Sequence, residues 1–187
     1  MNIHEIGPFV YLQDHLGRGT MDVEQHWKII RKTVNQANRS NRFCAVATVN
    51  PDGSPRISPI GSLILGEAGK AFYFEEFPKN MRENLDRDPR ICVLAVCGGF
   101  WFWLKSLYRG RFDAHPGLRL MGRAGGRRTA TQEEVTKWQK RVRPFRRLKG
   151  YELLWKDMRH VRDIAFEAAE PLRLGPMARG LWEGDEK

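Results

Sequence analysis

The chain has 187 residues, of which 41% are hydrophobic and 29% are charged, a composition typical of a globular protein with a sizeable core. No apolar run approaches the ~20 residues that span a bilayer, and the N-terminus lacks the cationic start and apolar stretch of a signal peptide. The formal net charge is +10, which suggests an anionic partner such as a phosphorylated cofactor, nucleic acid or a membrane surface. Three cysteines cannot all pair with one another, so we expect reduced thiols in a cytoplasmic protein, and no membrane partner is expected.

The apolar pattern predicts one helix followed mainly by strands. Val23, Trp27, Ile30, Val34 and Ala37 recur at steps of four and three, which indicates a helix over 21–40. The period then becomes strand-like, with strands expected over 43–49, 55–65, 71–77, 90–96, about 118–130 and about 159–174. Further helices are expected up to Asp88, over 131–142 and within 145–158, with a loop or short helix over 100–117.

Hairpin connections dominate this order, and crossover helices between most strands are missing. The sheet is therefore predicted to be mainly antiparallel, in a mainly β, α+β protein of barrel type. We expect a single domain over residues 1–187, with its helical N-terminal segment at 21–40 and its barrel core at about 42–174.

The second expected strand carries polar residues and prolines where a buried strand would be apolar. It follows an "NPDG" turn (50–53) and begins with Pro55, Arg56, Ser58 and Pro59. Arg56 and Ser58 are two residues apart, so their side chains share a face of the strand. A guanidinium beside a hydroxyl suits a phosphate group.

A second anion-binding signal lies at the next strand-loop-helix unit, over 74–85. Lys79 and Asn80 fall in the first turn of the predicted helix, where free backbone N–H groups and the helix dipole favour an anion. Arg56 and Lys79 are therefore the candidates for phosphate binding. The alternative is that both are ordinary solvated surface cations.

The motifs "AVATVNPDGSPRISPI", "FYF" and "PKNMRENLDRDPRICVLAV" together resemble the pyridoxamine 5′-phosphate oxidase-like family of FMN-binding split barrels. The resemblance covers residues from about Arg42 to Val96. It implies a six-stranded antiparallel split barrel with flanking helices, and a homodimer with one FMN per subunit at the interface. It also implies that the cofactor is lined by Arg56, Ser58, Pro59, Ile60, Gly61, Ser62, Phe74, Glu75, Lys79, Asn80 and Met81.

The chain departs from relatives close to the oxidase itself at five positions. These relatives carry Ser-Arg-Lys where this chain has Lys79-Asn80-Met81, a Thr where Glu75 stands, and a cation near the apolar Leu63. A carboxylate beside a phosphate is repulsive, so we expect Glu75 to point away with Lys79 as its counter-ion. Oxidation of vitamin B6 is therefore not expected, whereas FMN binding is.

The resemblance implies an FMN-dependent oxidoreductase with an unknown small-molecule substrate, in which the flavin carries out hydride transfer. No acid–base pair stands out, so no catalytic residue is assigned. One alternative is a deazaflavin (F420)-dependent reductase on the same barrel. Another is a non-enzymatic flavin carrier or nucleic-acid-binding protein, with nucleic acid the less favoured partner.

The C-terminal half carries most of the positive charge. Residues 101–160 contain sixteen Lys or Arg against five Asp or Glu, and the remainder is near neutral. The run "KRVRPFRRLK" (140–149) could contact nucleic acid, attract a second anionic cofactor such as a nicotinamide phosphate or a polyglutamylated deazaflavin, or form a solvated helix face.

The remaining chemistry-bearing residues give weaker signals. The cluster of Trp101, Trp103 and Tyr108 could cover the flavin, seal the dimer or fill space beneath a loop. The three cysteines are expected to be reduced core residues, because no second pair completes a zinc pattern. The five histidines show no metal-type spacing, so no metal site is expected.

Overall fold

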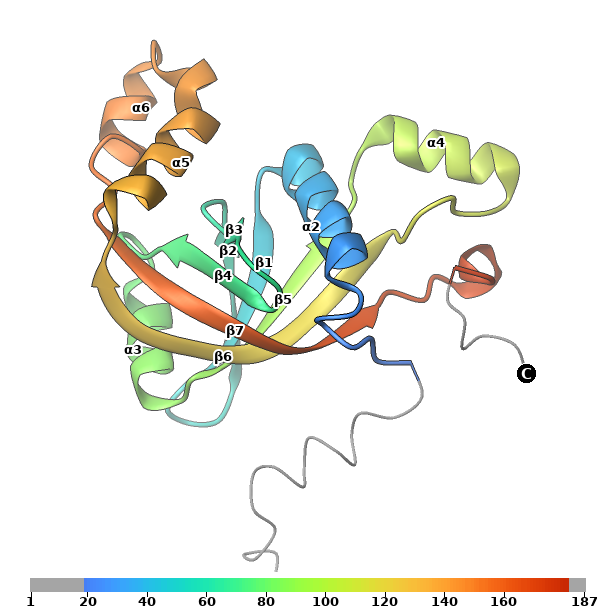
Figure 1. Ribbon diagram of the computed structural model, residues 1–187, viewed down its shortest axis with the longest axis horizontal. Helices are drawn as coiled ribbons and strands as arrows, with labels where there is room; N and C mark the ends of the chain where they lie inside the picture. The colour runs from blue at the N-terminus through green and yellow to red at the C-terminus, as the bar shows by residue number, and fades with distance from the viewer. Residues whose placement is uncertain (1–18, 182–187) are drawn as a thin grey trace, which may run out of the picture.

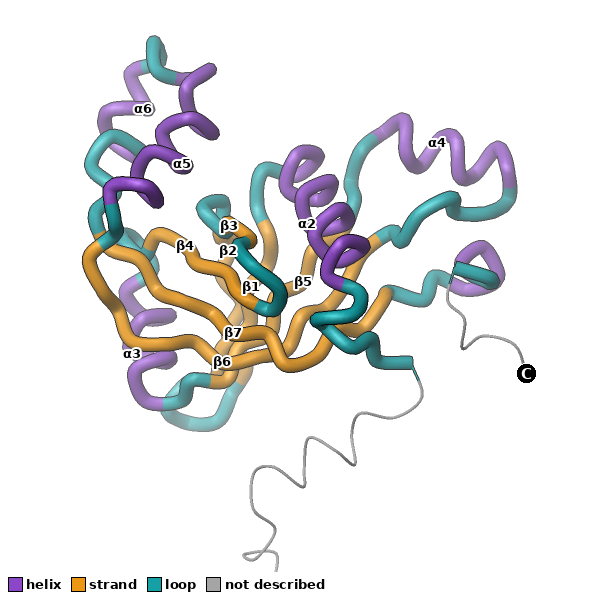
Figure 2. Tube along the Cα trace, in the orientation of Figure 1, coloured by secondary structure: helices purple, strands orange, loops and turns teal. Residues whose placement is uncertain are grey.

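The computed structural model describes residues 19–181, which form one antiparallel sheet with flanking helices (Figures 1 and 2). The strands are β1 (Cys44–Val49), β2 (Pro55–Ile60), β3 (Ile64–Leu65), β4 (Lys70–Phe74), β5 (Arg90–Val96), β6 (Gly117–Thr129) and β7 (His160–Pro171). The helices are α2 (Trp27–Asn41), α3 (Lys79–Arg87), α4 (Phe100–Arg109), α5 (Gln132–Val142) and α6 (Lys149–Leu154). The strand order is β2-β1-β5-β6-β7-β4-β3.

The predicted antiparallel α+β fold is confirmed, but the sheet has seven strands where six were expected. The predicted second strand, 55–65, breaks at Gly61 into β2 and β3. Directly after the break, the Ser62 hydroxyl bonds both the N–H and the C=O of Phe74 at 3.1 Å. A Cβ on Gly61 would lie 3.0 Å from the carbonyl oxygen of Arg42, so the chain passes close to the end of α2 at this point.

The main core lies between α2 and the sheet. Ile30, Val34 and Ala37 lie on the buried face of α2, as the spacing predicted, and the helix packs against β5 and β6. In Figure 1 α2 lies across the concave side of the curved sheet. The helix begins at Trp27, later than expected, because residues 23–26 form turns, and Asp22 before them accepts a hydrogen bond from the N–H of Gln25.

A second core lies where α5 and α6 meet β4 and β7. Its buried residues are Phe72, Phe74, Trp138, Val142, Tyr151, Met158 and Val161. The predicted capping box begins α5: Thr131 accepts from the N–H of Glu134, and Glu134 accepts from the N–H of Thr131 at 2.8 Å. The sheet therefore packs against helices on both of its faces. Arg141 of α5 also donates to the carbonyl of Leu63, which places α5 beside the segment that follows β2.

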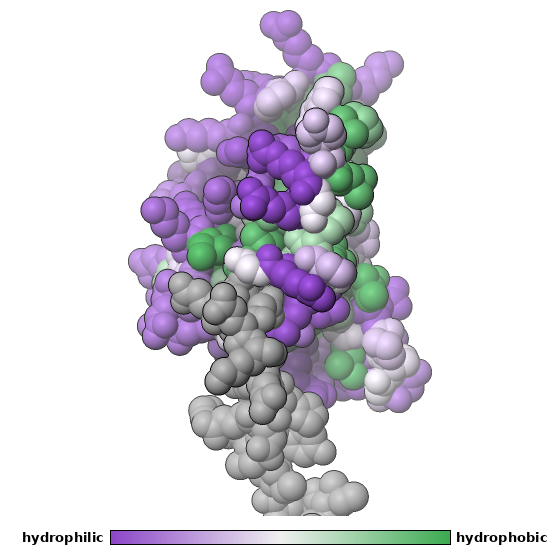
Figure 3. All heavy atoms as spheres, turned by 90° about the vertical axis from the view of Figure 1, so that its right-hand side faces the viewer, coloured by the Kyte–Doolittle hydropathy of each residue, from purple (hydrophilic) through white to green (hydrophobic). Residues whose placement is uncertain are grey.

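The segment 100–117, expected to be a loop or short helix, contains α4. Phe102 and Trp103 contact Phe112, and the Trp103 indole N–H donates to the carbonyl of Cys97 at 2.7 Å. The opposite face of α4 is exposed. Figure 3 faces the α4 end of the molecule, where apolar side chains gather along one edge. Within residues 19–181, no helix combines the length and the apolar character needed to cross a membrane.

Candidate functional site

The two segments predicted to bind phosphate meet in the structure. Arg56 on β2 lies beside Asn80 in the first turn of α3. With the Asn80 amide oxygen facing the guanidinium, it accepts from the two Arg56 Nη atoms at 3.2 and 3.3 Å. Residues 24 positions apart in the sequence thus form one polar surface, to which the neighbouring Lys79 adds an exposed ammonium group.

The start of α3 has the electrostatic character of an anion site. No acidic residue lies in its first turn, and no side chain caps its N-terminus. The first helical hydrogen bond runs from Arg82 N–H to Pro78 O, so the N–H groups of Asn80 and Met81 precede the helical ladder. Free N–H groups and the positive end of the helix dipole, beside a lysine and an arginine, favour a bound anion.

Glu75 and Glu76, which precede α3 in the chain, are bound to groups on β7 and beside it. Glu75 is buried and forms an ion pair with Arg162, at 2.7 Å from Nε and 3.0 Å from Nη2. Lys79 was expected to be the counter-ion of Glu75, and this prediction is wrong. The counter-ion is Arg162, which lies on β7, the strand paired with β4. Glu76 accepts from the N–H groups of Arg159 and His160 at 2.6 and 2.7 Å. Partial burial opposes ionisation of Glu76, but these two hydrogen bonds lower its pKa.

The eleven residues implied by the family resemblance divide by exposure. Arg56, Pro59, Lys79 and Asn80 are exposed, and Ser58 and Gly61 are half-buried. The other five, Ile60, Ser62, Phe74, Glu75 and Met81, are buried. The buried side chains serve the core or internal hydrogen bonds, so they are not available to a ligand.

The aromatic cluster on α4 splits between two faces. Trp103 packs inward, as described above, whereas the side chains of Trp101 and Tyr108 are 77% and 91% exposed. Only the latter two are available to a cofactor or a partner chain.

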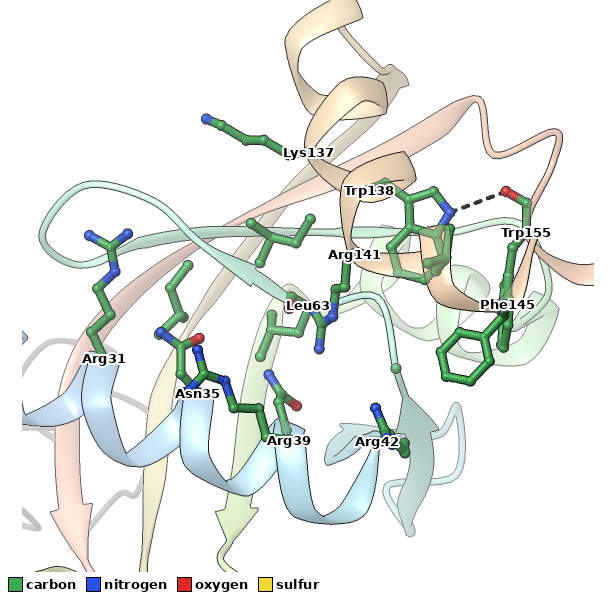
Figure 4. A pocket seen from close by; sticks show the side chains of 15 residues that line it. Arg31, Asn35, Arg39, Arg42, Leu63, Lys137, Trp138, Arg141, Phe145 and Trp155 are labelled. Atoms are coloured by element: carbon green, nitrogen blue, oxygen red, sulfur yellow. Dashed lines mark hydrogen bonds between the residues drawn. The ribbon is translucent and has the colours of Figure 1, made fainter. Parts of the chain in front are cut away.

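A cavity of about 660 Å³ lies at the other end of β2, between α2 and α5 (Figure 4). Gly61, the residue that follows β2, lines it. Its cationic side chains are Arg31, Arg39, Arg42, Lys137 and Arg141. At ~3.3 Å per residue, β2 separates Arg56 from Gly61 by roughly 17 Å. The strand thus joins two cationic regions, one at each end.

Sequence reasoning missed this cavity. The signal was present in the helix: Arg31, Asn35 and Arg39 recur at steps of four, which places them on one polar stripe of α2. Within the basic run 140–149, Arg141 lines the cavity opposite α2 and donates to the carbonyl of Leu63. No local pattern relates these two helices, because the strands between them determine their distance.

The cysteines and histidines offer no metal site in the described residues, where no group of three or more ligands converges. His4 and His15 lie outside these residues. All three cysteines are free thiols. Burial raises the pKa of Cys44 to about 12 and that of Cys97 to about 11, so both thiols stay protonated in the core.

The sequence matches a known protein family, and the fold is similar to those of known proteins. The family model described as pyridoxamine 5′-phosphate oxidase matches residues 30–170. No curated protein is significantly similar. An FMN-binding protein from Syntrophomonas wolfei aligns with a TM-score of 0.54 at 10% identity, covering 90% of this chain and 99% of its own.

Two further solved structures share the fold. HupZ from Group A Streptococcus has a TM-score of 0.52 at 19% identity, covering 79% of this chain and 97% of its own. A Clostridium acetobutylicum protein of the pyridoxinephosphate oxidase family, related to general stress protein 26 of B. subtilis, has a TM-score of 0.51 at 18% identity, covering 79% and 89%. At these identities the likeness concerns the fold.

Proposed function

Because the chain belongs to the pyridoxamine 5′-phosphate oxidase family, we propose that it is an FMN-binding oxidoreductase whose phosphate site is formed by β2 and the start of α3. The contact between Arg56 and Asn80 carries this proposal. It brings a guanidinium, an ammonium and uncapped helix N–H groups to one place, while Glu75 and Glu76 are held elsewhere. A phosphate dianion needs such charge-assisted donors.

The residues of this chain position the cofactor. Arg56 and Lys79 hold the phosphate, and the half-buried Ser58 lies two residues along the strand from Arg56. The flavin lies along β2, whose extended backbone offers N–H and C=O groups to the polar edge of the ring. When bound, FMN supplies hydride-transfer chemistry, and the protein supplies its position and electrostatic surroundings.

We also propose that the functional unit is a cytoplasmic homodimer with the flavin between the subunits. β2 supports this proposal, because it is exposed along most of its length and its Ile57 side chain is 71% exposed. An exposed β-branched side chain next to Arg56 fits a surface that a second copy covers.

The test begins with the colour of the purified protein. Wild type should show the visible absorbance of an oxidised flavin, and mass spectrometry of the released ligand should give FMN. Arg56→Gln/Lys79→Gln should bind FMN at least about tenfold more weakly, because two charge-assisted contacts are lost.

Arg147→Gln/Lys149→Gln is the matched control, since it removes the same charge from an exposed segment away from β2 and α3. It should bind FMN like wild type. A protein that neither carries nor takes up FMN contradicts the proposal. Release of a deazaflavin would instead support the F420-dependent alternative.

A further inference from the structure

The cavity between α2 and α5 is lined by cations without compensating acids. Arg31, Arg39 and Arg42 come from α2 and its C-terminal end, and Lys137 and Arg141 come from α5. No Asp or Glu is among its fifteen lining residues. In Figure 4 the side chain of Arg141 extends from α5 toward Leu63 and the α2 side of the cavity.

The arginines of this cavity have no carboxylate partner among residues 19–181. Arg141 donates to the carbonyl of Leu63 at 2.6 Å, and Arg42 lies over the ring of Phe145 at 5.7 Å. Of the five cations, only Lys137 forms an ion pair in this part of the chain, an exposed one with Glu133. The four guanidinium groups are therefore available to an anion.

Arg141 is the most unusual of the four. Burial lowers its pKa, and the like charge of Arg42 lowers it further. The nearby Cys44 thiol provides no negative charge at neutral pH, because its own pKa is about 12. A guanidinium removed from water without a counter-ion costs the fold free energy, and a bound anion would recover it.

The rest of the lining is apolar. Leu63, Ile64, Leu65, Trp138, Phe145 and Trp155 contribute to it. The indole N–H of Trp138 donates to the carbonyl of Trp155, which fixes that ring within the lining. A surface of this kind packs against a flat or apolar body, as ligand pockets generally do.

We propose that this cavity binds a small organic anion with a flat apolar body and at least two carboxylate or phosphate groups. Arg31, Arg39 and Arg141 bind the anionic groups, and the aromatic lining binds the body. That this anion is the substrate rests on the proposed function: a flavin anchored at Arg56 and extended along β2 would end near Gly61, which lines this cavity.

Binding is measured with pyrene-1,3,6,8-tetrasulfonate, a flat fluorescent polyanion, by anisotropy at constant ionic strength on the purified protein. We expect saturable binding that is at least about tenfold weaker in Arg31→Gln/Arg39→Gln. Both residues are exposed, so this variant should fold normally. Arg147→Gln/Lys149→Gln, which removes the same charge outside the cavity, should bind within about twofold of wild type.

Competition identifies the chemical class. Naphthalene-1,4-dicarboxylate and 2-methylnaphthalene-1,4-diyl bisphosphate, which carry two anionic groups on the same flat body, should each displace the fluorophore better than inorganic phosphate. Their relative strengths distinguish a preference for carboxylate from one for phosphate. Equal displacement by inorganic phosphate overturns the requirement for an apolar body. Equal weakening in both double variants overturns the site, since it would show attraction to net charge alone.

The FMN content of each sample separates this proposal from the proposed function. Loss of fluorophore binding in Arg31→Gln/Arg39→Gln with unchanged flavin absorbance supports a distinct site. Fluorophore binding that persists unchanged in this variant overturns the site, whatever the flavin content. A colourless wild type that still binds the fluorophore through these arginines leaves the cavity proposal standing and contradicts only the flavin proposal.

Discussion

Arg162 on β7 and Glu75 after β4 form an ion pair in which both side chains are only 1% exposed. The same guanidinium donates to Asp86 on α3 at 2.6 Å and to the carbonyl of Gly125 on β6 at 2.9 Å. Tyr73 also donates to Glu75, at 2.5 Å. One arginine thus connects the C-terminal turn of α3 to β6, β7 and the end of β4, which holds the helix against the sheet.

This pair should couple strongly in unfolding experiments. Glu75→Leu and Arg162→Met should each lower the free energy of unfolding by about 3–5 kcal/mol, because each removes the closest buried partner of the other charge. Among the charged groups of the described residues, Arg162 then keeps only the more exposed Asp86, and Glu75 keeps only Arg127 at 3.8 Å. The double variant should lose clearly less than the sum of the two. Urea denaturation of the four proteins measures the coupling. Additive losses would mean that the two side chains act independently.

Stability should depend on Glu134 in acid. Hydrogen bonds from Arg128 and the capping interaction with Thr131 lower the pKa of Glu134 to about 2, although partial burial opposes this. A carboxyl with a lowered pKa stabilises the fold above its unfolded pKa of about 4.5, and this contribution is lost as the pH falls toward 2. Glu134→Gln should cost about 1–2 kcal/mol at pH 7.

The difference between Glu134→Gln and wild type should shrink between about pH 5 and pH 2 in urea titrations. A difference that stays constant over this range would contradict the role of ionised Glu134.

Gly122 should not tolerate a side chain. A Cβ there would lie 2.1 Å from the carbonyl oxygen of Ala165 and 2.8 Å from the Cα of Phe166, both on the paired strand β7. Gly122→Ala should lower stability by about 1–3 kcal/mol, because the backbones must separate. Gly126, on the same strand, has no atom within 4 Å of such a Cβ, so Gly126→Ala is the control. Thermal unfolding measures the melting temperatures of both variants. Equal melting temperatures would contradict the close approach of β6 and β7 at Gly122.

The thiols should react slowly in the folded protein. Cys44 and Cys97 are buried with pKa values of about 12 and 11, and burial also raises the pKa of Cys92. We expect Ellman's reagent at pH 8 to modify no thiol rapidly before denaturation and all three afterwards. One rapidly modified cysteine in the native protein would identify a reactive thiol that the packing does not account for.

Local patterns predicted the elements well where neighbouring residues determine them. The strand 90–96 has the expected limits, and the "NPDG" turn and the capping box at Thr131 form as predicted. The break at Gly61 was missed because Ser62 bonds a residue 12 positions away. The counter-ion of Glu75 was missed because Arg162 is 87 positions away and reaches it only through the pairing of β4 with β7.

The same limit applies to the candidate site. Arg56 and Lys79 were selected from turn and helix-start chemistry, which is local, and the structure brings their segments together. The cavity arginines of α2 and α5 lie about a hundred residues apart in the sequence. Their proximity depends on the curvature of the sheet, which no short pattern records.

The prolines of β2 have a consequence for how molecules of this protein meet. β2 is an edge strand, and Pro55 and Pro59 have no N–H with which to extend the sheet. A foreign strand therefore cannot form a continuous hydrogen-bond ladder along this edge, which guards the exposed strand against edge-to-edge aggregation. A second copy that covers β2 is therefore expected to contact it mainly through side chains, without extending the sheet from one subunit to the next.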